Sequence, residues 1–329
     1  NGFRRVGSSE FHVGDHLRFV AALRGHEGWG LLANGVVAHA ALGAAGNSLD
    51  FGPRLVSPSG EAVSRSSGGE AYVDADGGLQ ALFVTADDGL YALFNPRAAL
   101  GDSPGGTADV TPQLQPEPSV PIRSLALERT PLGTNGTTRA RGYLVTSRNV
   151  YEWALGGSPA RWSSKLLVLG GGEPVEVWFD TQKSALGRVG YADGQIFTLP
   201  SGYQLTLPLP GDDATPVKVL DYENFGGWPV ALTTTGLWAA SWDVASDGTV
   251  ENHFDGGASN RPMAWHKLTL PGGAEPWLAT PGRGKLFVGL RKVPASACEA
   301  TDAGDLRSLY TLSVFLPGEV RKLAEYCRN

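Results

Sequence analysis

The sequence predicts an all-β fold. A block of two short strands joined by a polar turn, which usually holds a Gly, recurs along the 329 residues, most clearly at 81–94, 142–153 and 228–238. Runs that alternate apolar and polar residues, bounded by Pro and Gly, follow these blocks and have the period of β-strands. The 45 Gly and 22 Pro suit an architecture with many turns. No segment reads as a confident helix.

Repeats of roughly 40 to 70 residues that are built only from strands are typical of the blades of a β-propeller. The sequence therefore predicts one propeller domain over 1–329, with six four-stranded blades and seven as the alternative. The predicted blades are 15–60, 69–117, 118–172, 173–213, 214–274 and 275–329. Residues 1–14 would add a closing strand beside the last blade. Closure matters because an unpaired sheet edge invites aggregation.

Each predicted blade has four strands in a fixed order. The first follows a junction with Pro, as at 174–180 and 216–221, because Pro cannot donate to a strand ladder and sits at strand ends. The second and third form the recurring block, and the third opens on an apolar and aromatic pair such as Leu90-Tyr91. The fourth alternates and ends in Pro or Gly. Its clearest copies are 165–169, 204–208 and 265–271.

The last predicted blade carries both cysteines of the chain, Cys298 and Cys327. Cys298 lies in a polar insertion at 293–307, between the second strand at 285–290 and the third at 309–312. Because both Cys fall in one repeat, we expect a Cys298–Cys327 disulfide, which would imply an oxidising compartment. Two unrelated buried thiols are the alternative. The first residue is Asn1 rather than Met, which a cleaved signal peptide would explain.

Composition excludes several classes of function. A net charge of −6 argues against a nucleic-acid surface, since phosphate binding needs a concentrated basic patch. No apolar run approaches the ~20 residues of a membrane-spanning helix. Basic residues that are mostly Arg, together with abundant Ala and Gly, favour a bacterial source of high GC content.

Acidic residues gather at or near the ends of the predicted first strands. They are Asp74, Asp76, Glu128, Asp180, Asp221 and Glu223. First strands line the central channel of a propeller, so these side chains would form a ring at its rim. Clustered carboxylates suit Ca²⁺ or Mg²⁺, so this ring is a candidate Ca²⁺ site. Solvated strand ends at a wet channel mouth are the favoured interpretation of the same residues. Residues 74–78 begin like a calcium loop but lack its later acidic ligands.

The common catalytic signatures are absent from the sequence. None of the six His has a partner at a metal-ligand spacing such as His-Glu-x-x-His. His266, on a predicted fourth strand, is expected at the surface or an interface. The sequence has no Gly-x-Ser-x-Gly elbow, no phosphate-binding Walker loop and no Cys-x-x-Cys.

Over nearly its whole length the chain resembles the β-propeller superfamily. The strand, turn and aromatic pattern of the three clear blocks is similar to that of bacterial six- or seven-bladed repeat propellers. The chain departs from the WD40 family, since Trp-Asp occurs once only, at Trp242-Asp243, and it lacks the repeated double Gly of Kelch proteins. The resemblance therefore implies a fold and no functional residues.

These observations predict a non-enzymatic binding or scaffold module that contacts a protein or a glycan in a bacterial assembly. Its expected location is extracellular, periplasmic or on the outer surface. The alternative is a carbohydrate-active enzyme of the propeller type that uses rim carboxylates as acid and base. That chemistry needs two carboxyl groups about 5 to 10 Å apart across a pocket.

Overall fold

The elements that the computed structural model describes are 23 β-strands, and Pro96 is the one described residue with a helical assignment, so the predicted all-β class is confirmed there. The described residues are 17–23, 27–32, 35–43, 46–57, 59–60, 63, 68–73, 79–86, 88–96, 107–109, 111, 113–128, 138–157, 161–170, 172–179, 186–211, 217–225, 228–241, 262–270, 275–282, 285–292, 305–312 and 320–328. No helix in this part is long and apolar enough to cross a membrane. The predicted closing strand at 1–14 lies outside the described residues.

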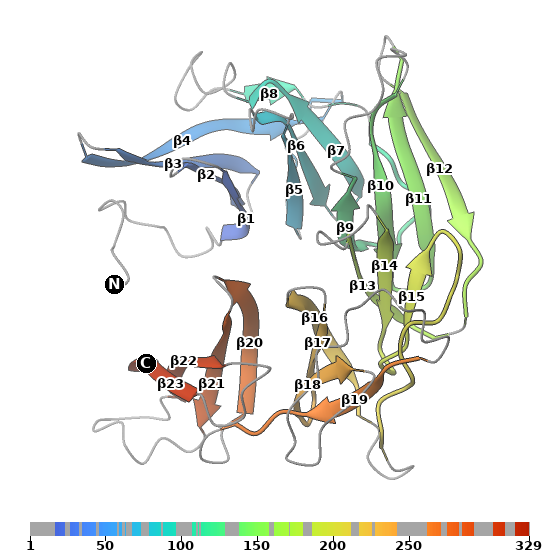
Figure 1. The fold of residues 1–329 in the computed structure, drawn as a ribbon. Coiled ribbons are helices and arrows are strands. Elements are labelled where there is room, and N and C mark those ends of the chain that lie inside the picture. The colour runs from blue at the N-terminus through green and yellow to red at the C-terminus, as the bar shows by residue number, and fades with distance from the viewer. Residues whose placement is uncertain are drawn as a thin grey trace. The chain divides into compact units, whose positions relative to one another are not determined.

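The chain divides into two compact units. The first comprises Asn1–Val168 and Val177–Phe179, and the second comprises Leu169–Glu176 and Asp180–Asn329. Strands that are close in sequence build most of each sheet, so most arrows of one sheet have similar colours in Figure 1. The sheets therefore form mainly from short connections, as the repeat pattern predicts.

The first unit holds three sheets. The first sheet contains β1 (Leu17–Leu23), β2 (Glu27–Leu32), β3 (Val36–Gly43), β4 (Gly46–Val56) and β8 (Thr107–Asp109); the second contains β5 (Gly68–Val73), β6 (Leu79–Ala86) and β7 (Gly89–Phe94); the third contains β9 (Ile122–Leu127), β10 (Thr138–Thr146), β11 (Val150–Gly156) and β12 (Arg161–Leu167). β8 corrects the predicted boundary. It falls in the second predicted repeat but pairs in parallel with β4 of the first sheet, a long-range pairing that no local pattern encodes.

The middle sheet of the first unit is buried on both faces. Leu82 and Val84 of β6 pack with Trp29 of the first sheet, while Phe83 between them packs with Trp153 of the third. Alternate side chains of a strand point to opposite faces. A strand covered on both faces is apolar at nearly every position, which explains the run Ala-Leu-Phe-Val in β6.

The second unit holds most of three further sheets. They contain β13 (Pro174–Phe179), β14 (Gly187–Tyr191) and β15 (Ile196–Leu199); β16 (Val219–Phe225), β17 (Trp228–Thr233), β18 (Gly236–Ser241) and β19 (Ala264–Lys267); and β20 (Glu275–Gly282), β21 (Lys285–Lys292), β22 (Asp305–Leu312) and β23 (Val320–Arg328). The predicted strand at 204–208 makes only single bridges, from Gln204 to Phe197 and from Thr206 to Met263.

The sheet β16 to β19 is also covered on both faces within the second unit. Leu237 belongs to a buried cluster with Val288 of the last sheet. On the other side, the Tyr222 ring lies so close to Gly190 that a Cβ there would be 2.3 Å from a ring carbon. The Trp265 indole donates hydrogen bonds to backbone oxygens of Gly194 and Leu207, at 3.0 and 2.9 Å. Consecutive sheets therefore pack face against face in this unit too.

Two turn glycines give the first testable prediction. Gly89 and Gly236 open β7 and β18 with φ of 147° and 133°, as expected for these tight hairpins. A Cβ on Gly89 would lie 2.6 Å from the backbone oxygen of Leu114, whereas on Gly236 it would meet only the flexible end of Lys267, at 3.2 Å. We expect Gly89→Val to destabilise by about 3 kcal/mol and Gly236→Val by roughly 1–2 kcal/mol. Urea unfolding of both variants measures the difference, and equal costs would contradict it.

Candidate functional site

Polar side chains link the first strands of consecutive sheets. In each case a side chain of one first strand accepts a hydrogen bond from a backbone N–H of the next. The pairs are Glu70 with Leu127 (3.3 Å), Ser124 with Val177 (3.2 Å) and Glu176 with Tyr222 (2.9 Å). An edge strand leaves such N–H groups without a ladder partner, so these side chains satisfy groups that the sheet itself does not. Sequence patterns did not reveal this arrangement, because it depends on contacts between repeats.

Three acidic side chains of the second unit gather around one of these links. Glu176 comes from β13, and Asp221 and Glu223 come from β16. The Tyr222 N–H donates to Glu176 Oε2 at 2.9 Å and to Asp221 Oδ1 at 3.0 Å, so both oxygens converge on one donor. The Asp221 carboxyl also lies close enough to Glu176 to raise the pKa of that group.

The surroundings of this cluster favour protonated carboxyl groups. Burial, then the neighbouring charge of Asp221, raises the pKa of Glu176 well above its usual value. The same two causes, burial first, raise the pKa of Glu223 to about 8. The Tyr222 hydroxyl, which donates to the backbone oxygen of Tyr191, also has a raised pKa, chiefly because it is buried. The cluster is therefore a partly neutral, hydrogen-bonded group rather than an open ring of carboxylates.

The structure places the predicted rim residues that it describes in different surroundings. Asp221 and Glu223 lie together, but within β16 rather than at the strand end where the sequence placed them, because β16 runs on to Phe225. Glu128 follows β9 and accepts two hydrogen bonds from the Arg141 guanidinium, one of them at 2.8 Å. Asp74, Asp76 and Asp180 lie outside the described residues. Glu176, which the sequence interpretation missed, completes the cluster because β13 and β16 adjoin.

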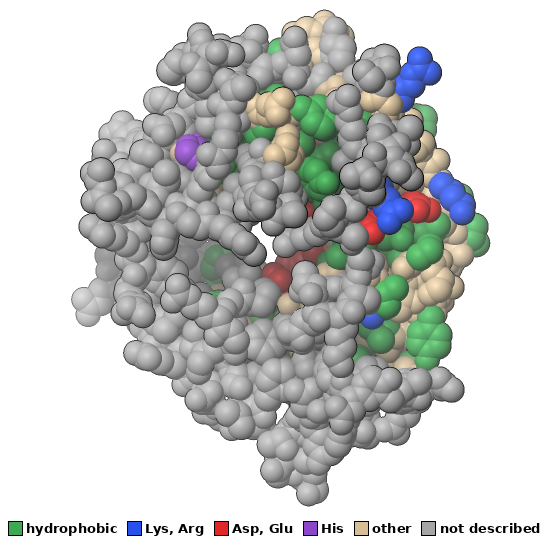
Figure 2. Space-filling model, turned by 45° about the horizontal axis from the view of Figure 1, so that its top comes forward, with side chains coloured by type: hydrophobic (Ala, Val, Ile, Leu, Met, Phe, Trp, Pro, Cys, Tyr) green, Lys and Arg blue, Asp and Glu red, His purple; other side chains and the backbone are tan. Residues whose placement is uncertain are grey.

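Charges of the described residues are scattered on the face shown in Figure 2. Lys and Arg side chains stand apart there, some against Asp or Glu, and form no continuous basic patch among the coloured residues. No group of three His, Cys, Asp or Glu side chains in the described part is arranged to hold a metal ion. The candidate Ca²⁺ site is not tested for the acidic residues outside this part, Asp74, Asp76 and Asp180.

Glu117, which no sequence pattern indicated, holds the β10–β11 hairpin. Its Oε1 accepts hydrogen bonds from Thr146 Oγ1 (2.9 Å), Asn149 Nδ2 (2.7 Å) and the Tyr151 hydroxyl (2.9 Å). Burial alone would raise the pKa of Glu117, but the hydrogen bonds from Asn149, Thr146 and Tyr151 outweigh it, and the pKa is lowered. The carboxylate therefore stabilises the hairpin in its charged form.

We expect Glu117→Ala to destabilise the protein by about 2–3 kcal/mol, because hydrogen bonds to a charged acceptor are strong and Thr146 is buried. Glu117→Gln keeps one acceptor oxygen and should cost less. Since the folded pKa is lowered, the stabilisation is present above the unfolded pKa near 4.5 and is lost as pH falls through the folded value. Equal costs for the two variants, measured by denaturant unfolding at pH 7, would contradict this role.

The structure gives partial information on two other predicted features, the position of His266 and the disulfide. His266 on β19 is half-buried, its Nε2 has no hydrogen-bond partner within the described part, and burial lowers its pKa. A neutral packing residue fits these facts better than the expected surface position. Cys327 lies on β23 opposite Leu306, and Cys298 lies outside the described residues, so the disulfide stays a prediction.

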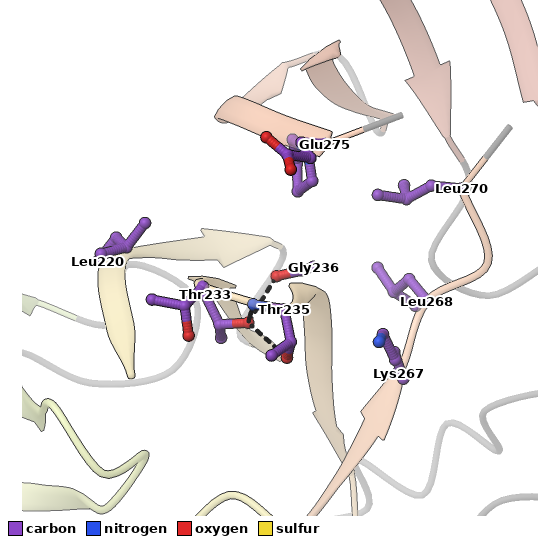
Figure 3. A pocket seen from close by; sticks show the side chains of 10 residues that line it. Leu220, Thr233, Thr235, Gly236, Lys267, Leu268, Leu270 and Glu275 are labelled. Carbon is purple, nitrogen blue, oxygen red and sulfur yellow. Dashed lines mark hydrogen bonds between the residues drawn. The ribbon is translucent and has the colours of Figure 1, made fainter. Parts of the chain in front are cut away.

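A cavity of about 550 Å³ lies in the second unit, at the end of the sheet β16 to β19 where the β17–β18 turn and the β19–β20 connection meet. Figure 3 shows side chains from the turn, from β19 and its continuation, and from β20 around one space. A smaller hollow of about 320 Å³ lies on the polar face of β10 to β12 in the first unit, between Arg141, Glu152 and Lys165. The larger cavity has three leucines and one cation, Lys267, among its lining residues.

No protein-family model matches the chain, and no curated protein matches it. Among solved structures, one match is described as "Complex structure of the fission yeast SREBP-SCAP binding domains". It is 10% identical, has a TM-score of 0.48, and the alignment covers 94% of this chain and 76% of that chain. At this similarity the fold and the sites have to be argued from this chain's own geometry.

Proposed function

We propose that the chain is a six-bladed β-propeller that acts as a non-enzymatic binding module for a protein partner. Two features support the fold. Middle sheets of both units are covered on both faces by their neighbours in sequence, as blades are. Side chains of one first strand satisfy backbone groups of the next, which fits first strands that adjoin around a common axis.

The exposed end of the outer strand β12 carries the binding proposal. β12 is the last strand in its sheet, so one edge of it has no strand partner among the described residues. Leu166 is 47% exposed and Val168, just beyond the strand, is 91% exposed. Adjacent exposed apolar side chains on a free edge are a feature of protein–protein contact sites. In the acidic cluster, by contrast, Glu176 and Asp221 accept an internal hydrogen bond from the Tyr222 N–H.

The alternative of a carbohydrate-active enzyme finds little support in the carboxyl geometry. Glu176 and Asp221 both accept a hydrogen bond from one backbone donor, the Tyr222 N–H. Glycosidase carboxyl groups stand about 5 to 10 Å apart with the substrate between them. This pair therefore suits a structural link better than an acid and base.

A photo-crosslinking residue placed at Leu166 or at Val168, in cells that make the protein, tests the binding proposal. Position Lys165 is the control, since it is exposed on β12 but points to the opposite face. We expect one discrete protein adduct from 166 and from 168 and none from 165. The result against the proposal is the absence of an adduct at both positions, or the same adducts from all three. An adduct that only glycosidases remove would replace the protein partner with a glycan.

The proposed location, extracellular, periplasmic or on the outer surface, depends on the Cys298–Cys327 disulfide. Thiol alkylation and mass spectrometry of the unreduced protein provide the test. Two alkylated cysteines would remove the main support for an oxidising compartment.

A further inference from the structure

The large cavity of the second unit is built from four parts of the chain. They are the β17–β18 turn, the end of β19 with the residues after it, the start of β20, and β16. The lining residues are Leu220, Thr233, Thr234, Thr235, Gly236, Lys267, Leu268, Leu270, Glu275 and Pro276. Figure 3 shows that Glu275 and Lys267 lie on different sides of the space, with Leu268 and Leu270 along the wall between them. A volume of about 550 Å³ is in the range of small-molecule and short-peptide sites.

One wall of the cavity is apolar. Leu268 and Leu270 are partly buried and pack against the core shared by β17, β18, β20 and β21. Leu220, which also lines the cavity, is 55% exposed. Covering these side chains with an apolar ligand would remove hydrocarbon surface from water, at about 25 cal/mol per Å². The rigid core behind the two leucines keeps this wall in place.

Lys267 is the free cation of the cavity. Its Nζ lies 5.8 Å from the centroid of the Trp238 ring, and no ion pair with the described residues involves it. Gly236 leaves room for its stem, since a Cβ there would be 3.2 Å from Lys267 Cε. The hydroxyl of Thr233 is already used: it donates to Gly236 O at 2.8 Å and accepts from Thr235 N at 3.1 Å. Lys267 is therefore the strong donor that remains for an anionic ligand.

We propose that this cavity binds an apolar monocarboxylate, either a free aliphatic acid or the C-terminus of a peptide that ends in an apolar residue. The hydrocarbon part would lie on Leu268 and Leu270, and the carboxylate would pair with the Lys267 ammonium. A monocarboxylate matches the single positive charge of Lys267, whereas a dianion such as a phosphate monoester would leave one negative charge without a cationic partner among the lining residues. The site is independent of the exposed end of β12, so either proposal can fail alone.

Calorimetric titration with four probes tests this site: octanoate, acetyl-Ala-Ala-Leu with a free carboxylate, the C-terminal amide of that peptide, and octyl phosphate. We expect octanoate, the free-acid peptide or both to bind, and the amide and the phosphate to bind at least tenfold more weakly. Whether octanoate or the peptide binds more tightly identifies the source. Absence of binding by both carboxylates at millimolar concentration, or equal binding of acid and amide, overturns the proposal.

Variants assign the binding to Lys267. Lys267→Met keeps the aliphatic stem over Trp238 and should weaken carboxylate binding at least tenfold, which is about 1.4 kcal/mol. Leu220→Glu adds a negative charge at an exposed lining position and should also weaken it. The control is Lys218→Met, because Lys218 pairs with Glu173 at 3.0 Å and does not line the cavity. Equal losses in Lys267→Met and Lys218→Met, at unchanged melting temperatures, would overturn the assignment.

Discussion

Replacing Gly142 with Ala will lower the free energy of unfolding by about 3 kcal/mol or more. Gly142 lies on β10, between Leu127 of β9 and Trp153 of β11. A Cβ at this position would be 1.9 Å from the backbone oxygen of Ala126 and 3.1 Å from Trp153 Cζ2. A backbone atom on one side and a buried indole on the other leave no direction in which the methyl group can move. The sheet has to open between β9 and β10, next to a cluster that holds Leu125 and Leu127.

Gly60→Ala is the control for this prediction. Gly60 has a φ of 84°, but no atom lies within 4 Å of a Cβ built there. Its cost is therefore the backbone strain alone, about 1–2 kcal/mol. Urea unfolding of the two variants measures both values. If Gly142→Ala costs no more than Gly60→Ala, the close approach of β9 and β10 is not present in solution.

The strands of the repeating blocks could be predicted from the sequence because their signals are local. Residues 81–94 form β6 and β7, and residues 228–238 lie in β17 and β18 as expected. Alternating or continuous apolar runs, with a Gly at the turn, define such hairpins without reference to the rest of the chain. The positive φ of Gly89 and Gly236 follows from the same local signal.

Elements that depend on other repeats could not be predicted. β8 joins the first sheet by pairing in parallel with β4, about 50 residues earlier, and no periodicity encodes that partner. Residues 204–208 alternate apolar and polar side chains like a strand. In the structure, however, Gln204 and Thr206 each form an isolated β-bridge, to Phe197 and to Met263. Their alternation reflects side-chain exposure rather than a continuous ladder.

Only part of the acidic cluster could be predicted, because its members come from two different repeats. Asp221 and Glu223 could be selected because acidic residues recur at or near the ends of the predicted first strands. Glu176 alternates with apolar neighbours in β13, so it looked like an ordinary solvent-facing residue. Its role becomes visible only when the Tyr222 N–H of β16 is placed beside it. The cluster therefore links β13 to β16, whereas the sequence suggested an open ring of carboxylates that binds a cation.

The free energy of unfolding will fall as pH rises from about 5 to 8, because the acidic cluster holds protons in the folded state that it loses on unfolding. The pKa of Glu223 is about 8 in the folded protein, against a usual 4.5, and that of Glu176 is also raised. Between these values the folded state keeps a proton that the unfolded state has lost, so each rise in pH favours unfolding. Each such group contributes a slope of up to about 1.4 kcal/mol per pH unit.

The variants Glu223→Gln and Glu176→Gln isolate this contribution, because other groups also titrate in the window. The lowered pKa of His266 acts with the opposite sign, since a His that is neutral when folded loses stability as pH falls below 6.5. Gln at 176 keeps an oxygen that can accept from the Tyr222 N–H, so the link is kept without the charge. We expect each variant to be more stable than the parent at pH 8 and to show a flatter slope in urea unfolding at pH 5, 6, 7 and 8. The matched control is Glu128→Gln, which removes a carboxylate outside the cluster that pairs with Arg141. Parental slopes in both cluster variants would mean that the carboxyl groups of Glu176 and Glu223 are solvated and do not hold protons in the folded state.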